Sequence, residues 1–572
     1  MAKVWLKHYP PGVPAEINPD EFGSLGEMIV DSCNRFAHLP AYHSMGNKIT
    51  YAELDARSKD FAAWLQNVAK LEKGDRVAIM LPNVLQYPIA LIGILRAGFT
   101  AVNVNPLYTA RELQHQLHDS GAKAIVILEN FAHVLQEVIE HTGIKHVLRT
   151  GVGDLLSFPR SAVVNIVVRH IRKQVPSYQL PNAVSFAQAL RAGKFLTFTP
   201  PICTHDDIAF LQYTGGTTGV AKGAMLTHRN MIANVLQATS WLGTKLKAGE
   251  VVAITALPLY HIFSLTANCL TFMRLGGYNV LIANPRDFPA FVKTISRFQV
   301  SFFSGVNSLF NALLNTPGFD KLDFSPLKLS LGGGMAVQKA VADQWKKVTG
   351  NVLTQAWGLT ETSPAAAINP FEVEDFNGSI GLPIPSTEIS LRDEAGNDVG
   401  LNQTGEICVR GPQVMRGYWQ RPDETAKVMM ADGWLRTGDI GYMDDKGFVF
   451  LQDRKKDMVL VSGFNVYPNE VEDVIVKHPG VLEVAAVAQA DEKSGEVVAV
   501  FIVRKDPNLT AEQVIEHCRA ELTGYKVPKH VYFRNELPKT NVGKILRRAL
   551  RDELAGKPVA MPEKEGASHS SH

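Results

Sequence analysis

The sequence predicts an α/β fold with a large, multi-layered N-terminal domain of helix-covered sheets and a smaller, mobile α+β cap domain at the C-terminus. Short strand-like runs alternate with helical segments over most of the 572 residues, a pattern typical of parallel sheets covered by helices. A dense run of charges at residues 453–457 then interrupts this alternation. The length allows roughly four units of about 150 residues, so one large body and one cap are compatible with it.

Runs of mainly aliphatic residues predict strands in the N-terminal part at 76–80, 124–128, 251–256, 279–282 and 300–303. A further strand, 208–213, leads into a glycine-rich loop, and a helix over 230–241 is expected after that loop. Residues 88–95 are interpreted as a core helix beneath a strand at 99–104. Arg96 ends this apolar run well short of the roughly 18 residues that a membrane span needs.

A short strand at 448–452 precedes the charged run, and a compact α+β unit follows it. There, Asn469 with Glu472 is expected to cap a helix that ends at Pro479-Gly480, and Thr510 with Gln513 forms a second capping box. Strands are expected at 484–488 and 497–503. We therefore divide the chain into an N-terminal domain (1–452), a hinge (453–457), a cap (458–556) and a polar tail (557–572).

Composition excludes several classes of protein. The chain has 58 Lys and Arg against 56 Asp and Glu, a net charge of +2, and is 46% apolar. This balance is that of a folded globular chain and offers no broad basic field for nucleic acid. The five cysteines are far apart without a CxxC pair, which predicts neither a zinc site nor a disulfide framework and fits a reducing compartment. The first 20 residues lack the apolar middle region of a secretory signal, so we expect a cytoplasmic protein.

Residues 161–173 form a basic amphipathic pattern. One helical stripe carries Val163, Val164, Val167, Val168 and Ile171, and another carries Asn165, Arg169 and Arg172, with Lys173 beside them. Two interpretations remain open. The favoured one is an ordinary surface helix packed on the core, and the other is contact with an anionic membrane surface.

The most informative segment extends from Tyr213 to Gly223. Its glycines and hydroxyl residues can present backbone N–H groups and hydroxyl donors to phosphate oxygens, and Lys222 adds a positive charge. It is not a Walker A loop, because that motif would require glycine at Ala221 and a hydroxyl residue at Gly223. The pattern thus predicts a phosphate-binding loop and disfavours a P-loop kinase or ATPase.

This loop resembles the signature of the adenylate-forming enzymes, the superfamily of acyl-CoA synthetases, luciferases and peptide-synthetase adenylation domains. Gly215 and Ala221 stand where the family usually has Ser and Pro. Further family motifs follow in order at 257–261, 332–335, 357–361, 405–406, 437–439, 453–457, 462–464 and 541–544. Residues 432–440 with 453–456 resemble the fatty acyl-CoA synthetase signature, and nearly the whole chain resembles the bacterial long-chain fatty acid–CoA ligases.

The resemblance implies that ATP, a long-chain fatty acid and CoA react through an acyl-adenylate to acyl-CoA, AMP and pyrophosphate. It assigns catalytic roles to Lys544, Glu361, Thr217 and Lys222, with Glu361 as the ligand of Mg²⁺. Asp439 would accept from the ribose with Arg454 nearby, and Trp357 keeps an aromatic face for adenine where the family usually has Tyr. The implied ATP site also includes Tyr213, Thr214, Gly215, Gly216, Thr218, Gly219, Gly333, Gly334, Gly358 and Thr360.

For the acyl chain, the resemblance implies a pocket lined by Tyr260, His261, Phe263, Gly305 and Val306. We interpret His261 as a wall or gate, because no His, Cys or acidic residue lies at metal-ligand spacing from it. The resemblance further implies that the cap turns about Asp453 for the CoA step. That turn would replace Lys544 with a face that carries Lys456, Ser462, Gly463 and Phe464.

Two alternatives remain open at this point. A medium-chain or aromatic acid–CoA ligase would share every ATP residue. A non-catalytic, membrane-associated fatty acid binding or uptake factor would have lost Glu361, Asp439 or Lys544, and all three are present. The resemblance implies an enzyme on the inner face of the cell membrane that feeds β-oxidation and is coupled to fatty acid uptake. A homodimer is compatible with the sequence, which leaves the oligomeric state open.

Overall fold

The structure, a computed structural model, describes residues 3–214, 221–491 and 493–557. Its N-terminal part contains two large sheets. The seven-stranded sheet has the order β7-β6-β5-β3-β4-β8-β9, and all its pairs are parallel except β8–β9. Its strands are β3 (Arg76–Met80), β4 (Thr100–Asn103), β5 (Ala124–Leu128), β6 (His146–Thr150), β7 (Val184–Ser185), β8 (Ile208–Thr214) and β9 (Lys222–Thr227).

The nine-stranded sheet has the order β16-β15-β14-β13-β12-β10-β11-β1-β2. It is parallel from β14 to β1 and antiparallel at both ends. Its strands are β1 (Pro40–Ser44), β2 (Asn47–Thr50), β10 (Val252–Thr255), β11 (Tyr278–Leu281), β12 (Phe302–Gly305), β13 (Leu329–Gly332), β14 (Leu353–Gly358), β15 (Ala365–Ile368) and β16 (Leu382–Pro383).

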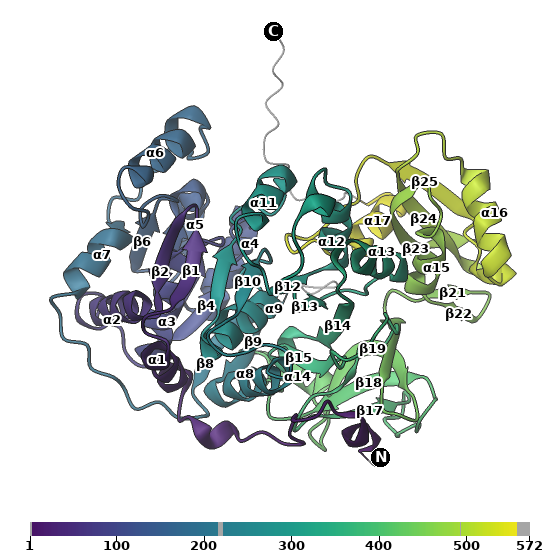
Figure 1. Ribbon diagram of the computed structural model, residues 1–572, viewed down its shortest axis with the longest axis horizontal. Helices are drawn as coiled ribbons and strands as arrows, with labels where there is room; N and C mark the ends of the chain where they lie inside the picture. The colour runs from purple at the N-terminus through teal and green to yellow at the C-terminus, as the bar shows by residue number, and fades with distance from the viewer. Residues whose placement is uncertain (1–2, 215–220, 492, 558–572) are drawn as a thin grey trace, which may run out of the picture.

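Helices cover these sheets and bury two large apolar clusters (Figure 1). The apolar run in the sequence forms α3 (Gln86–Arg96), which packs against α2 (Tyr51–Asn67). The other helices of this part are α1 (Leu25–Arg35), α4 (Ala110–Ser120), α5 (Ala132–Val138), α6 (Arg160–Ile166), α7 (Phe186–Gly193), α8 (His228–Leu242), α9 (Ile262–Ser264), α10 (Thr271–Arg274), α11 (Phe288–Ile295), α12 (Asn307–Leu314), α13 (Lys339–Thr349) and α14 (Pro422–Val428). Among the described residues, no helix is both long and apolar enough to cross a bilayer.

The sequence patterns did not predict the third sheet of this part. It is antiparallel and consists of β17 (Glu388–Arg392), β18 (Gly405–Arg410), β19 (Leu435–Met443) and β20 (Val449–Arg454). The expected strand at 448–452 is β20, so the charged run begins inside a strand and not after it. Asp453 and Arg454 pair with Ile440 and Asp439 of β19.

The C-terminal part is a separate five-stranded sheet, seen at the right of Figure 1. Its elements are β21 (Val459–Val461), β22 (Phe464–Val466), α15 (Pro468–Ile475), β23 (Val481–Asp491), β24 (Gly495–Arg504), α16 (Ala511–Glu521), β25 (His530–Arg534) and α17 (Arg547–Leu554). Its apolar side chains form clusters separate from those of the N-terminal part. The capping box of Thr510 and Gln513 is present at the start of α16.

Two local predictions are wrong. Asn469 does not cap α15: the helix begins at Pro468, whose fixed φ suits the first helical position, and Asn469 lies inside the first turn. The glycine-rich loop does not connect a strand directly to a helix. It connects β8 to β9, an antiparallel neighbour, and α8 begins only after β9. β9 escaped prediction because Lys222 and the glycine next to it weaken the strand signal.

Candidate active site

Lys544 of the C-terminal part lies against the N-terminal part at Gly334, just after β13. A Cβ atom added to Gly334 would lie 3.4 Å from Cε of Lys544. The Lys544 loop is held there because Ser308 on α12 donates a 2.8 Å hydrogen bond to the carbonyl of Gly543, and Asn311 donates to the carbonyl of Leu482 at 3.0 Å. Burial, reinforced by the charge of Arg454, lowers the pKa of Lys544 to about 8, while Asp439 and Glu361 oppose the shift.

The predicted ribose ligand lies within the same site. Asp439 on β19 is 4% exposed, and its Oδ2 accepts a 2.9 Å hydrogen bond from the indole N–H of Trp357 on β14. Arg454 lies 3.5 Å from its other oxygen. Burial raises the pKa of Asp439, and these two partners counteract that rise. Trp357 thus packs in the apolar core, and its indole N–H also orients Asp439, the predicted ribose ligand.

Glu361 and Lys222 are connected through one tyrosine. The hydroxyl of Tyr418 donates a 2.6 Å hydrogen bond to Oε1 of Glu361, on the short 3₁₀-helix η8 (Thr360–Thr362). The ammonium of Lys222 lies 4.6 Å from the centre of the Tyr418 ring and forms a 2.6 Å ion pair with Glu424 on α14. The predicted phosphate-binding lysine is therefore paired with a carboxylate.

The described residues on either side of the predicted phosphate-binding loop belong to the seven-stranded sheet. Thr214 pairs with Lys222 across β8 and β9. The hydroxyl of Tyr213 donates to Asp119 at 2.7 Å, and Arg421 forms an ion pair with the other oxygen of Asp119 at 2.8 Å. Gly215, Gly216, Thr217, Thr218 and Gly219 lie outside the described residues. The side chain of Tyr213 is therefore held at the end of β8 by Asp119.

Glycines shape the walls of the site. A Cβ atom at Gly333 would lie 3.2 Å from the ring of Phe263, and one at Gly358 would lie 1.7 Å from the carbonyl oxygen of Pro364. Gly358 therefore cannot take a larger residue without a backbone shift, and at Gly333 the Phe263 ring and the Ala356 carbonyl oxygen, 3.0 Å away, leave little room for one. Thr360 follows at the start of η8.

The predicted acyl-pocket residues lie beside these glycines. Val306 contacts both glycine positions of the interface, since added Cβ atoms at Gly334 and Gly543 would lie 3.6 and 3.1 Å from its methyl groups. A Cβ at Gly305 would meet the ring of Phe310 at 2.9 Å. Tyr260 precedes His261, whose Nδ1 accepts the backbone N–H of Phe263 at 3.3 Å. Burial, and secondarily Lys544, lowers the pKa of His261 to about 3, which fits an uncharged wall.

The predicted CoA face is divided: Gly463 and Phe464 are exposed, whereas Lys456 lies within the electrostatic influence of Asp439. Ser462 and Gly463 form the turn between β21 and β22 with φ of 49° and 86°, and nothing lies within 4 Å of a Cβ added at Gly463. Phe464 is 57% exposed and stacks on Tyr525 with ring centroids 5.0 Å apart. Lys456 lies in the charged run, where burial and Arg454 lower its pKa to about 8. The structure thus brings Lys544 into the site and leaves Gly463 and Phe464 towards solvent.

Sequence reasoning missed Tyr418 and Glu424. Both lie in the segment before and within α14, where none of the recognised motifs falls. Pro422 followed by two acidic residues does signal a helix N-terminus, but nothing in the sequence ties Glu424 to Lys222, 202 positions earlier.

The fold and this site define an AMP-binding enzyme. Residues 29–419 match the family model of the AMP-binding enzymes and residues 470–544 that of their C-terminal domain, so the chain belongs to this family. Several relatives are 58% identical to this chain, over alignments of 553 to 557 residues. One of these, the long-chain-fatty-acid–CoA ligase of Yersinia pestis, is 58% identical over 553 residues, which cover 97% of this chain and 98% of the relative.

The enzyme of the same name from Haemophilus influenzae is 51% identical over 560 residues, 97% of this chain and 99% of that protein. Among solved structures, ATP-bound MatB from Rhodopseudomonas palustris is similar with a TM-score of 0.80 at 27% identity, over 92% of this chain and 98% of MatB. The anthranilate CoA ligase AuaEII in complex with anthranoyl-AMP has a TM-score of 0.83 at 23% identity, over 94% and 99% of the two chains. The latter shows the shared fold.

Proposed function

We propose that this protein is a long-chain fatty acid–CoA ligase that converts ATP, a long-chain fatty acid and CoA into acyl-CoA, AMP and pyrophosphate through an acyl-adenylate. The observation that carries the proposal is the docking of Lys544 beside Gly334, within the electrostatic influence of Asp439 and Glu361. The near-full-length similarity to long-chain-fatty-acid–CoA ligases supports the choice of substrate class.

In the first half-reaction the fatty acid carboxylate attacks the α-phosphate while pyrophosphate leaves. Two anions must meet, and the cation of Lys544 offsets their repulsion. Asp439, oriented by Trp357, would hold the ribose. Lys222 would leave Glu424 for the phosphates, since a nucleotide triphosphate offers more negative charge than one carboxylate. Gly333 and Gly334 would allow the nucleotide to approach the backbone closely.

Glu361 fits a magnesium site formed together with the nucleotide. Its carboxylate is a hard oxygen donor with one oxygen held by Tyr418, and the described residues contain no cluster of three or more metal-binding side chains. Magnesium is usually bound by one or two carboxylates plus substrate phosphates. When bound there, Mg²⁺ would neutralise charge on the departing pyrophosphate.

For the second half-reaction, Lys544 must leave and CoA must reach the acyl carbonyl. We propose 453–457 as the hinge, with residues 1–452 and 458–556 as the two moving bodies. A Cβ atom added at Gly463 would have no neighbour within 4 Å in this orientation, so this side of the turn is available to form a passage for the pantetheine arm. Phe464 and Lys456 would then join the site.

The test is fatty acid-dependent exchange between ATP and pyrophosphate across acids of increasing chain length, followed by AMP and acyl-CoA after CoA is added. We expect exchange with long-chain acids and stoichiometric AMP. Exchange only with medium-chain or aromatic acids would reassign the substrate. Release of ADP would indicate a kinase. Absence of exchange with every acid would refute the ligase assignment.

We also propose that the enzyme works at the anionic inner surface of the cell membrane. The supporting observation is the helix of α6 and the following π-helix η5 (Val167–Ile171), which projects at the upper left of Figure 1. Val163, Ile166 and Ile171 are 55%, 54% and 70% exposed on it, and Phe158, just before the helix, is 85% exposed. Only Val164 of the predicted apolar stripe packs against the large core.

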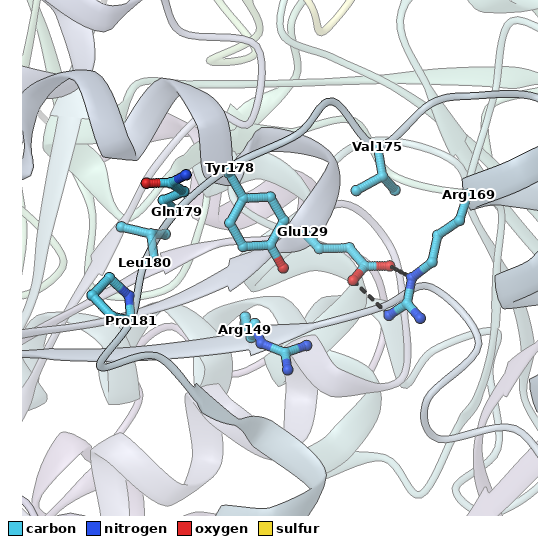
Figure 2. Close-up of a pocket in the computed structure, with 8 residues that line it drawn as sticks. All are labelled: Glu129, Arg149, Arg169, Val175, Tyr178, Gln179, Leu180 and Pro181. Atoms are coloured by element: carbon cyan, nitrogen blue, oxygen red, sulfur yellow. Dashed lines mark hydrogen bonds and ion pairs between the residues drawn. The ribbon is translucent and has the colours of Figure 1, made fainter.

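The polar side of this helix faces the protein. Asn165 donates to Asp154 at 2.8 Å, and Arg169 forms two 2.7 Å hydrogen bonds to the buried Glu129 (Figure 2). Glu129 and Arg169 line a cavity of about 590 Å³ with Arg149, Val175, Tyr178, Gln179, Leu180 and Pro181. An ordinary surface helix has the opposite orientation. This orientation supports the membrane-contact interpretation, in which Arg169, paired with Glu129, is not one of the groups left for lipid head groups.

Sedimentation with vesicles of mixed neutral and anionic lipid tests the membrane contact. Replacing Ile166 and Ile171 with Ser should release the enzyme, because burial of each such side chain is worth about 1.5–3 kcal/mol. Replacing Arg172 and Lys173 with Gln should weaken binding by about 1 kcal/mol per charge on anionic vesicles only. The matched control replaces Phe195 and Ile202 with Ser. These side chains are 86% and 88% exposed and lie outside this helix. Equal binding by all variants would contradict the proposal.

A further inference from the structure

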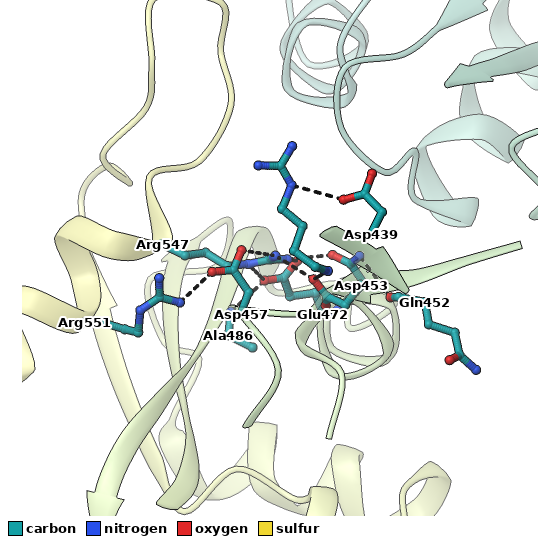
Figure 3. A network of polar contacts seen from close by, with 10 residues as sticks. Asp439, Gln452, Asp453, Asp457, Glu472, Ala486, Arg547 and Arg551 are labelled. Carbon is teal, nitrogen blue, oxygen red and sulfur yellow. Dashed lines mark hydrogen bonds and ion pairs between the residues drawn. The ribbon is translucent and has the colours of Figure 1, made fainter. Parts of the chain in front are cut away.

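A buried ionic cluster joins the proposed hinge to the helix that follows Lys544 (Figure 3). Arg547, the first residue of α17, lies three positions after Lys544. Its guanidinium donates to both oxygens of Glu472 at 3.1 and 2.8 Å and to the side-chain oxygen of Asn469 at 2.6 Å. It also donates to Oδ1 of Asp453 at 3.3 Å. Arg547 thereby ties α15 and α17 of the C-terminal part to the end of β20.

Asp453 is the point where the two parts meet. Its backbone pairs with Ile440 in the N-terminal sheet, whereas its carboxylate is 1% exposed among groups of the C-terminal part. Besides Arg547, the carboxylate accepts the backbone N–H of Asn469 at 2.8 Å, in the first turn of α15. A rotation about the Asp453 backbone displaces Asn469 and Arg547 relative to this carboxylate. The contacts are therefore specific to the orientation in which Lys544 reaches Gly334.

The connection from Arg547 back to Lys544 is short and internally bonded. The Lys544 N–H donates to the hydroxyl of Thr540 at 3.1 Å, and its carbonyl accepts the N–H of Thr540 at 2.7 Å. The N–H of Leu546 donates to the carbonyl of Pro538 at 2.8 Å. These bonds form a stiff turn, so fixing Arg547 also fixes the position from which the Lys544 side chain extends.

We propose that Arg547 is a positioning residue for acyl-adenylate formation: by binding Asp453, it holds the cap in the orientation that presents Lys544 to the substrate carboxylate and the α-phosphate. The contact is given up when the cap turns for the CoA step. Arg547 thus favours the first half-reaction without touching substrate. This inference rests on the proposed function and on the proposed hinge.

Helix α17 supplies a matched control one turn further on. Arg551 donates to Asp457 at 2.7 Å, with side-chain exposures of 25% and 10%, and no bond joins it to Asp453 among the contacts of the described residues. Loss of Arg551 would weaken the same part of the protein without releasing Asp453. The Arg551 variant therefore measures how much activity is lost when any arginine of α17 is removed.

The experiment compares Arg547→Gln, Arg547→Lys and Arg551→Gln with the unchanged protein. ATP–pyrophosphate exchange measures adenylation, and acyl-CoA formed from supplied acyl-adenylate and CoA measures the second half-reaction. We expect Arg547→Gln to lower adenylation about tenfold or more, the scale of one charge-assisted hydrogen bond, and to change the second step by less than about twofold. Arg547→Lys should recover part of the loss, and Arg551→Gln should not separate the two rates.

Arg547→Gln leaves Glu472 buried without its cation and can unfold the cap. Asp453→Asn is the second variant, because it removes the partner charge while the bonds between Arg547 and Glu472 stay. It should reproduce the separation of rates, and the double variant should be no worse than the stronger single one. Equal losses in both half-reactions, unchanged adenylation, or an equal separation with Arg551→Gln would overturn the inference. Failure of the unchanged protein to exchange pyrophosphate would instead refute the proposed function.

Discussion

The hydroxyl of Tyr418 donates a 2.6 Å hydrogen bond to Glu361, the acidic residue that the family motif singles out for magnesium. The ring of the same tyrosine lies beneath the ammonium of Lys222. One side chain outside the recognised motifs therefore supports both a proposed metal ligand and a proposed phosphate ligand. Burial, together with Glu361, raises the pKa of Tyr418, so the hydroxyl stays a donor at neutral pH.

Replacing Tyr418 with Phe should raise the magnesium concentration needed for half-maximal pyrophosphate exchange about tenfold. The ring under Lys222 remains, and only the hydrogen bond to a charged group is lost, worth about 1.5 kcal/mol or more. A magnesium titration measures the effect. Tyr442→Phe is the control, because that ring stacks on Phe450 in β19 and β20. An unchanged magnesium requirement would remove Tyr418 from this role.

Adenylation should decline as pH rises above about 8. The pKa of Lys544 is lowered to about 8, so the ammonium that offsets substrate repulsion is present below that pH and lost above it. Lys544→Arg should shift the decline to higher pH, and Lys544→Ala should lower exchange about 10²–10³-fold. Lys477→Gln, at an ion pair with Glu521 elsewhere in the cap, should keep the profile of the unchanged protein. An unchanged pH profile of adenylation in the Lys544 variants would contradict the role assigned to Lys544.

Replacing Trp357 with Phe should raise the KM for ATP about tenfold and leave the KM for the fatty acid unchanged. The ring stays, but Asp439, which is buried, loses its 2.9 Å donor and with it the orientation proposed for ribose. Trp357→Tyr restores a polar group at the end of the ring, so its KM for ATP should lie between those of Trp357→Phe and the unchanged protein. Steady-state kinetics with each substrate varied provides the measurement. Parallel changes in both KM values would show a general packing defect instead.

His228 should make the protein less stable in acid. Its Nδ1 accepts the backbone N–H of Leu25 at 3.1 Å, and burial lowers its pKa from 6.5 to about 4. Between these values the unfolded chain binds the proton and the folded one does not, so stability falls as pH drops from 6.5 towards 4, by about 3 kcal/mol at most. Urea unfolding of His228→Asn should show a smaller fall. His170→Asn, at an exposed position, should behave like the unchanged protein.

Strands and motifs that depend on local pattern were predictable. The strands at 76–80 and 124–128 match β3 and β5, and the capping box of Thr510 marks the start of α16. Hydrophobic periodicity and helix capping depend on residues that are close in the sequence, so the sequence of one chain is enough to predict them. The antiparallel sheet β17–β20 escaped because its short strands pair across loops of varied length. Register in such a sheet follows from contacts between distant residues.

The sequence by itself determined the chemistry of this protein: the order of the motifs and the identities of Lys544, Glu361 and Asp439. Only the tertiary structure decided which partners hold those groups, namely Tyr418 for Glu361, Trp357 for Asp439 and Glu424 for Lys222. It also decided that the helix after Phe158 turns its polar side inward. Residue types determine what a side chain can bind, whereas its actual partners depend on how strands and helices far apart in the chain pack.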